Sequence, residues 1–144
     1  MIKLTFLIPL FCFFQMHINN DNTDNSPLVT VIKFISAESF NDTLEAKKYI
    51  NIEKVYGKYI DKQDSTAELV WKNKLTFATN LSKDKKFTNH FKFHDYIFKE
   101  VVKSRKAKVI LSSKDINDSI KAIEYFLELR KDDNWEIVDI QYIK

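Results

Sequence analysis

The end of the chain carries the pattern that most constrains the fold, two apolar segments joined by a polar turn. In residues 121–129 the apolar side chains stand at every second position, at Ile123, Tyr125, Leu127 and Leu129. A polar stretch follows at 131–134, and apolar residues return from 135 to 143. Because successive side chains of a strand point to opposite faces, this pattern predicts two antiparallel strands.

The second of these segments changes its apolar parity partway along. Trp135 and Ile137 are at odd positions, whereas Val138, Ile140 and Tyr142 are at even ones. One extra residue in a strand reverses the faces of all later side chains, so the switch favours a β-bulge, which bends a sheet. A strand covered on both faces would give the same pattern, and the two interpretations stay open here.

The same kind of switch occurs in an earlier segment, from about residue 89. Its apolar residues change parity across His94-Asp95: Phe91 and Phe93 before, then Tyr96, Phe98 and Val102 after. A further strand is indicated by Ala107, Val109 and Leu111, with turns at 104–105 and 114–118. We therefore expect an antiparallel meander over the last third of the chain.

Helices are predicted before this meander. Ser26-Pro27 supplies a capping hydroxyl and a proline at the first helical position. Segments 42–45 and 65–68 have the spacing of capping boxes. The apolar faces expected for the three helices are Leu28, Ile32 and Ile35; Ala46, Tyr49 and Ile50; and Ala67, Val70, Trp71, Phe77, Ala78 and Leu81. Gly57 favours a bend, within a helix extension or a short extended piece. Helices followed by an antiparallel sheet predict an α+β fold, with N-terminal helices packed on a curved antiparallel sheet.

Residues 1–18 have the layout of a secretory signal peptide. Lys3 gives a basic start and an apolar run from Leu4 to Phe14 follows, which is short for a membrane span. We expect a signal peptide at 1–18, a polar linker at 19–25 and a single domain at 26–144, exported to the periplasm or secreted, with no stable membrane span in the mature chain. An uncleaved anchor and a buried helix are the alternatives. Lipid attachment at Cys12 is disfavoured, because Leu10-Phe11 precede it where a small residue is needed.

The composition sets further limits. The formal net charge of +3 is too small to indicate nucleic acid binding, and 44% hydrophobic residues indicate a folded protein rather than a disordered one. Cys12 is the only cysteine, so a mature chain would have neither disulfides nor cysteine-ligated zinc. His90 and His94 would lie roughly 13 Å apart on a strand, too far for one ion, so we expect no metal and no cofactor.

Three segments together resemble the nuclear transport factor 2-like superfamily, whose members have a cystatin-like, cone-shaped fold, and particularly its small exported bacterial members. They are 46–50 after a capped helix start, the strand 106–111, and the strands 126–129 and 135–140 around a charged turn. The resemblance covers roughly residues 26 to 144. The chain departs from the family at Asn134, where a glycine is usual, and in an early hairpin reduced to the residues around Gly57.

The resemblance implies a cone whose open end can be a ligand pocket. Some members of the family are isomerases, dehydratases or epoxide hydrolases that use an Asp, His or Tyr in that cone. The strand-borne candidates here are His94, Asp95 and Asp139. His94 and Asp95 point to opposite faces of a regular strand, and Asp139 shares the parity of Gln141, which indicates solvent. No catalytic motif of the family can be transferred residue by residue.

Binding is the alternative to catalysis. Tyr49, Tyr56, Tyr125 and Trp135 are candidates to line a pocket for a small apolar ligand, although aromatic residues at such spacing also form packed cores. A sheet face with Phe126, Val138 or Tyr142 uncovered would favour a protein partner or a homodimer. We expect an exported small-ligand or protein-binding module without catalytic activity; the alternative is a pocket enzyme of the isomerase or dehydratase type.

Overall fold

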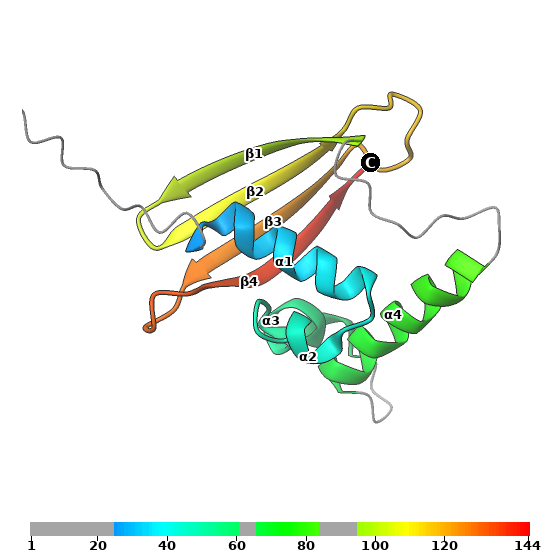
Figure 1. The fold of residues 1–144 in the computed structure, drawn as a ribbon, viewed down its shortest axis with the longest axis horizontal. Helices are drawn as coiled ribbons and strands as arrows, with labels where there is room; N and C mark the ends of the chain where they lie inside the picture. The colour runs from blue at the N-terminus through cyan, green and yellow to red at the C-terminus, as the bar shows by residue number, and fades with distance from the viewer. Residues whose placement is uncertain (1–24, 61–65, 84–94) are drawn as a thin grey trace, which may run out of the picture.

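A computed structural model describes residues 25–60, 66–83 and 95–144, with 78–83 described by their backbone alone. Four helices and a short 3-10 helix precede a four-stranded antiparallel sheet of order β1-β2-β3-β4 (Figure 1). The helical elements are α1 (Pro27–Ser39), α2 (Thr43–Ala46), α3 (Ile52–Tyr56), η2 (Gly57–Tyr59) and α4 (Ala67–Lys83). The strands are β1 (Tyr96–Lys103), β2 (Lys106–Ser113), β3 (Ala122–Leu129) and β4 (Trp135–Ile143). The predicted α+β class is confirmed.

Two predictions fall on residues outside these ranges. The signal peptide and most of the polar linker belong to residues 1–24, and the parity switch at His94 belongs to residues 84–94. Among the residues that the structure describes, no helix combines the length and the apolar character needed to cross a membrane.

The predicted bulge in the last strand is confirmed. Leu127 of β3 pairs with Ile137 of β4, whereas the preceding Phe126 pairs with Asp139. Val138 is therefore the extra residue. Because it interrupts the alternation, Ile137 before the bulge and Ile140 after it both remain buried, with 0% and 4% of their surface exposed. The bulge keeps both halves of β4 packed toward the helices.

The core lies between α1 and one face of the sheet. Phe34 is fully buried and meets the ring of Tyr125 edge to face, with ring centroids 6.4 Å apart. The buried face of α1 differs from the predicted one: Val31, Phe34 and Ile35 are buried, with Leu28 at the margin and Ile32 only partly covered. Positions 31, 34 and 35 have the spacing of one helical face, so the predicted period and Ile35 are confirmed, and the buried face is rotated from Ile32 toward Val31 and Phe34.

The predicted helix starts occur close to their expected places. The Ser26 hydroxyl accepts a hydrogen bond of 3.1 Å from the backbone N–H of Val29, and Pro27 follows it. Asp42 caps α2 in the same way. At α4 the capping hydroxyl is that of Thr66, one residue later than the box at 65–68 predicts. Gly57 has helical backbone angles and leads into η2, so the helical alternative holds there.

A short segment after α2 extends the sheet beside β4. The N–H of Asn51 donates to the carbonyl of Ile137, and the N–H of Ile137 donates to the carbonyl of Tyr49, both at 2.8 Å. These bonds fix Tyr49 next to the start of β4.

The last helix, α4, packs mainly on α3 and η2 through its buried Trp71 and Leu75. Figure 1 shows α4 extending away from the sheet. Phe77, predicted on the apolar face of this helix, is 65% exposed, because that side of α4 meets none of the other described elements.

Candidate functional site

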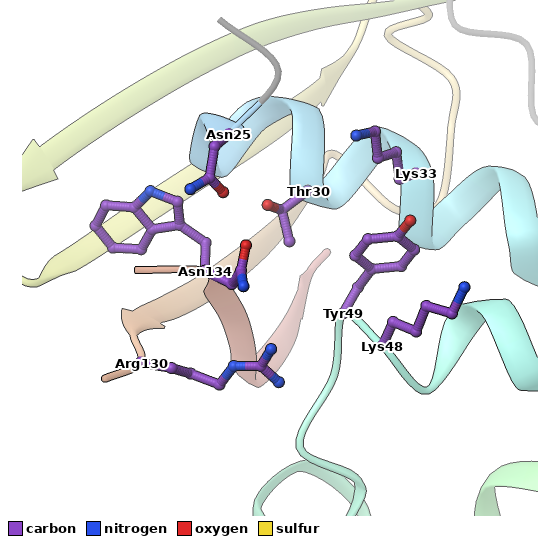
Figure 2. Close-up of a pocket in the computed structure, with 8 residues that line it drawn as sticks. Asn25, Thr30, Lys33, Lys48, Tyr49, Arg130 and Asn134 are labelled. Atoms are coloured by element: carbon purple, nitrogen blue, oxygen red, sulfur yellow. The ribbon is translucent and has the colours of Figure 1, made fainter. Parts of the chain in front are cut away.

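A pocket of about 600 Å³ opens between α1, the segment after α2 and the turn from β3 to β4 (Figure 2). Two of the four aromatic ligand-binding candidates, Tyr49 and Trp135, line it. The other lining residues are Asn25, Thr30, Lys33, Lys48, Arg130 and Asn134.

The walls of this pocket are held together by hydrogen bonds between distant parts of the chain. The side-chain amide of Asn25 donates a 2.5 Å hydrogen bond to the carbonyl of Asp133, which joins the start of α1 to the β3–β4 turn. Asp133 has a φ of 59°, a left-handed conformation that aspartate tolerates better than most residues. Tyr49 is held by its bonds to β4, so three separate elements form one wall.

One corner of the pocket is organised by Glu45, which is outside the lining. Its carboxylate accepts hydrogen bonds from the ammonium of Lys48, at 2.5 Å, and from the hydroxyl of Tyr49. The bonds from Lys48 and Tyr49 lower the pKa of Glu45. The bond to Glu45, with burial, raises the pKa of Tyr49 to about 12. Tyr49 therefore stays protonated at neutral pH.

The opposite corner is formed by Arg130 at the end of β3. Its Nε and Nη2 atoms donate to the two carboxylate oxygens of Asp132, at 3.2 and 3.0 Å. Its Nη1 atom lies 3.6 Å from a carboxylate oxygen of Glu136. The guanidinium is thus fixed in orientation by two acidic residues outside the lining, a geometry that a lysine would not reproduce.

Trp135 contributes both an apolar ring and a donor. Its side chain is 8% exposed and lines the pocket. Within the described ranges no hydrogen bond of its indole N–H is found, and no buried side-chain nitrogen or oxygen there lacks a partner. The indole N–H is therefore accessible to solvent and belongs to the exposed part of Trp135.

A second polar cluster lies between the helices and the end of β4. Lys74 of α4 donates hydrogen bonds of 3.0 Å to the hydroxyls of Tyr56 and Tyr142. Burial raises the pKa of Glu38, which Lys74 and a hydrogen bond from Trp71 partly offset. Burial would lower the pKa of Lys74, but Glu38 and the two tyrosines outweigh it and raise the pKa. Burial raises the pKa of Tyr56 to about 12. Every group in this cluster has an internal partner.

The acid-base candidates from the sequence are not brought together. Asp139 lies on the face of the sheet opposite α1, where it pairs with Lys58 of η2 and accepts a 2.9 Å bond from Gln141. Burial would raise the pKa of Asp139, but the bonds from Lys58 and Gln141 lower it. Asp95 lines another hollow beside the β2–β3 turn, at the opposite edge of the sheet. His94 lies outside the described residues.

The four aromatic candidates divide into two groups. Tyr49 and Trp135 line the pocket, whereas Tyr125 and Tyr56 are each 5% exposed and belong to the core. Sequence reasoning missed Lys33, Lys48 and Arg130, which line the pocket, because isolated cations on three elements have no common motif. In the described part of the chain, no group of three or more His, Cys, Asp or Glu side chains is placed to hold a metal ion.

The face of the sheet opposite α1, here called the outer face, is partly apolar. Ile97 and Val101 of β1 and Ile143 of β4 are 58%, 46% and 42% exposed. Phe126 also belongs to this face and is partly covered by Lys108, whose ammonium lies 5.6 Å from the ring centre. Tyr142 pairs with Ile123 and lies on the helix side instead.

No protein-family model and no curated protein sequence matches this chain.

Proposed function

We propose that the protein is a binding module without catalytic activity, and that a small ligand occupies the pocket beside Tyr49 and Trp135. The observation that carries this proposal is the convergence of two aromatic rings and several hydrogen-bond donors from three separate elements. The pocket volume of about 600 Å³ lies within the roughly 300–1,000 Å³ of small-molecule sites.

Binding is favoured over the isomerase or dehydratase alternative by the state of the lining groups. A general base must accept a proton near neutral pH. The pKa of Tyr49 is about 12 and that of Lys48 is raised by its bond to Glu45, so both keep their protons. Asp95 and Asp139, the acid-base candidates with described positions, are not among the residues that line this pocket. The lining groups are suited to hold a ligand by donation rather than to remove a proton from it.

The two tryptophans of the chain provide a direct test. In a ¹⁵N-labelled sample each gives an indole N–H resonance, and the Trp71→Phe variant assigns them. We expect at least one of benzoate, benzamide, benzylamine and indole to shift the Trp135 resonance in a saturable manner. Trp71, fully buried and bonded to Glu38, should not move. If none of the four compounds shifts the Trp135 resonance at millimolar concentration, the small-ligand proposal is wrong.

A second function, self-association through the outer face, is favoured by the exposed apolar residues of that face. Residues paired across antiparallel strands share a face. By this register the exposed Ile97 and Val101 of β1 share the outer face with Ile143 of β4. The acids of this face, Glu124, Glu128 and Asp139, already pair with Lys108, Lys54 and Lys58 of the same chain, so the apolar residues rather than the charges would form the contact.

Sedimentation equilibrium tests this second function. We expect a homodimer that the Ile97→Lys variant dissociates, because it places a charge in the apolar part of the outer face. Ile116→Lys is the matched control, since Ile116 is 85% exposed in the β2–β3 turn. A monomeric wild-type protein at high micromolar concentration, or equal effects of both variants, would contradict self-association.

We further propose that the chain is exported and belongs to the nuclear transport factor 2-like superfamily. Export is supported by the basic and apolar layout of residues 1–18, and the family by helices covering one face of a bulged antiparallel meander. N-terminal sequencing of exported protein should begin between about residues 15 and 26. An intact Met1 in that fraction would contradict cleavage. An experimental structure with a flat sheet that does not curve around α1 would contradict the family.

A further inference from the structure

The lining of the pocket has an unequal balance of charge. Three cationic side chains, Lys33, Lys48 and Arg130, come from α1, the segment after α2 and the end of β3. None of the described residues that line the pocket is an Asp or a Glu. Cations that line one pocket from separate elements, with no acid in the described lining, favour a negatively charged ligand group.

Two of these cations, Lys48 and Arg130, pair with acidic side chains that lie outside the lining of the pocket. Glu45 contacts Lys48, and Asp132 contacts Arg130 through a two-point bond, yet neither acid lines the pocket. Arg130 retains its Nη1 donors: in the described part of the chain Nη1 lies 3.6 Å from Glu136 without a hydrogen bond. An ammonium has three donors, so Lys48 can bind Glu45 and a ligand oxygen together. Lys48 and Arg130 are therefore positioned in advance, which lowers the entropic cost of binding.

The remaining lining groups suit the rest of such a ligand. The half-buried ring of Tyr49 and the small exposed part of Trp135 give an apolar wall, and the accessible indole N–H adds a neutral donor. Figure 2 shows Thr30, Tyr49, Arg130 and Asn134 arranged around the same space. The pocket thus joins a cationic part to an aromatic part.

We infer that this pocket binds a small organic anion, with a carboxylate or phosphate group held by Lys33, Lys48 and Arg130 and a flat apolar group packed against Tyr49 and Trp135. The inference rests on the proposed small-ligand function and adds the chemical class of the ligand.

Benzoate and benzamide form a matched pair of probes, because they have the same ring and size and differ in charge. We expect benzoate to shift the Trp135 indole resonance with an affinity at least about fivefold higher than that of benzamide, and benzylamine to bind more weakly than either. Raising the salt concentration from about 0.02 to 0.5 M should weaken the binding of benzoate and leave the binding of benzamide unchanged. Phenyl phosphate, titrated in parallel, shows whether a carboxylate or a phosphate is preferred.

Variants then connect the preference to these side chains. Lys33→Gln and Lys48→Gln should each lower the affinity for benzoate by about two- to fivefold, the range for exposed ion pairs, and leave the affinity for benzamide unchanged. Lys131→Gln is the control for net charge, because Lys131 is exposed next to Arg130 but does not line the pocket. An unchanged Trp71 resonance in each variant shows that the fold is intact.

The outcomes separate this inference from the function on which it rests. If benzamide, benzylamine or indole binds as tightly as benzoate and phenyl phosphate, the pocket is a ligand site and the anionic class is wrong. Equal weakening by Lys131→Gln and Lys48→Gln would also overturn the inference, since the effect would then come from net charge. If no compound binds, both the inference and the small-ligand function fail.

Discussion

The indole N–H of Trp71 donates a 2.9 Å hydrogen bond to a carboxylate oxygen of Glu38, and this bond joins α4 to α1 in the interior. The same carboxylate lies in the field of Lys74, which is bonded to Tyr56 and Tyr142. Because burial raises the pKa of Glu38, the carboxylate depends on Lys74 and Trp71 to remain ionised. Substitutions of Glu38 and Lys74 should therefore have non-additive effects on the free energy of unfolding.

Removing both of these charges should cost less free energy of unfolding than the sum of the costs of removing each one alone. Lys74→Met leaves Glu38 without its cation and two tyrosine hydroxyls without their donor, and we expect a loss of about 1–3 kcal/mol in the free energy of unfolding. In the double variant Lys74→Met/Glu38→Gln the loss should be smaller than the sum of the single losses. Urea denaturation of the four proteins measures the coupling. Additive losses would show that the charges act independently.

The stability of the α2–α4 contact should depend on pH through Glu68. Hydrogen bonds from Lys47 and Lys72 lower the pKa of Glu68 to about 2, from an ordinary value of 4.5. The folded-state pKa is the lower one, so the ionised form stabilises the fold above about pH 4.5 and this contribution disappears as the pH falls toward 2.

We therefore expect the difference in urea midpoint between wild type and Glu68→Gln to shrink over that pH range. Glu53→Gln is the control, since Glu53 has no ion pair among the described residues and lies on α3. A midpoint difference for Glu68→Gln that stays constant from pH 6 to pH 2 would exclude the effect.

Trp135 should act as a core residue although it also lines the pocket. With 8% of its surface exposed, Trp135→Ala should cost on the order of 3–5 kcal/mol, because the cavity left behind cannot collapse fully. Trp135→Phe keeps most of the ring and should cost clearly less. Urea unfolding measures both. A loss below about 1 kcal/mol for the alanine variant would place the ring at the surface.

Because of the bulge in β4, deletion of Val138 and deletion of Glu124 should have unequal effects on stability. Phe126 and Leu127 already pair with Asp139 and Ile137, so deletion of Val138 leaves a regular ladder with the buried side chains on their original face. We expect this variant to fold, with a loss within the usual single-site range of about 0.5–3 kcal/mol. Deletion of Glu124 from β3 has no bulge to absorb it and should turn Ile123 to the outer face, at a greater loss. Circular dichroism and urea unfolding compare them; equal losses would mean that Val138 is not the extra residue.

The elements that the sequence predicted best are those determined by neighbouring residues. Ser26-Pro27 and Asp42 cap helices through bonds to backbone groups three residues away, which are local in the chain. The bulge at Val138 was visible as a change of parity, because the burial of one face determines the register. The direction of the α1 face was not predictable in this way, since Ile32 and Val31 are equally apolar and only the sheet decides between them.

The pocket could be predicted only in its aromatic half. Tyr49 and Trp135 were candidates because large rings are noticeable at any position, whereas Lys33 and Arg130 resemble ordinary surface cations until the fold brings α1 and the β3–β4 turn together. Lys74 was missed for a related reason. A lysine in an amphipathic helix is expected in solvent, and its burial follows from the arrangement of Tyr56 and Tyr142 on two other elements.

The position of α4 also has a consequence for the dynamics of the molecule. Since this helix packs on α3 and η2 and is joined to α1 and β4 through Trp71 and Lys74, its detachment would break few contacts of the sheet. It should form a separate cooperative unit that opens at a lower free energy than global unfolding. Native-state hydrogen exchange would then show the amides of α4 losing protection while those of β2 and β3 remain closed.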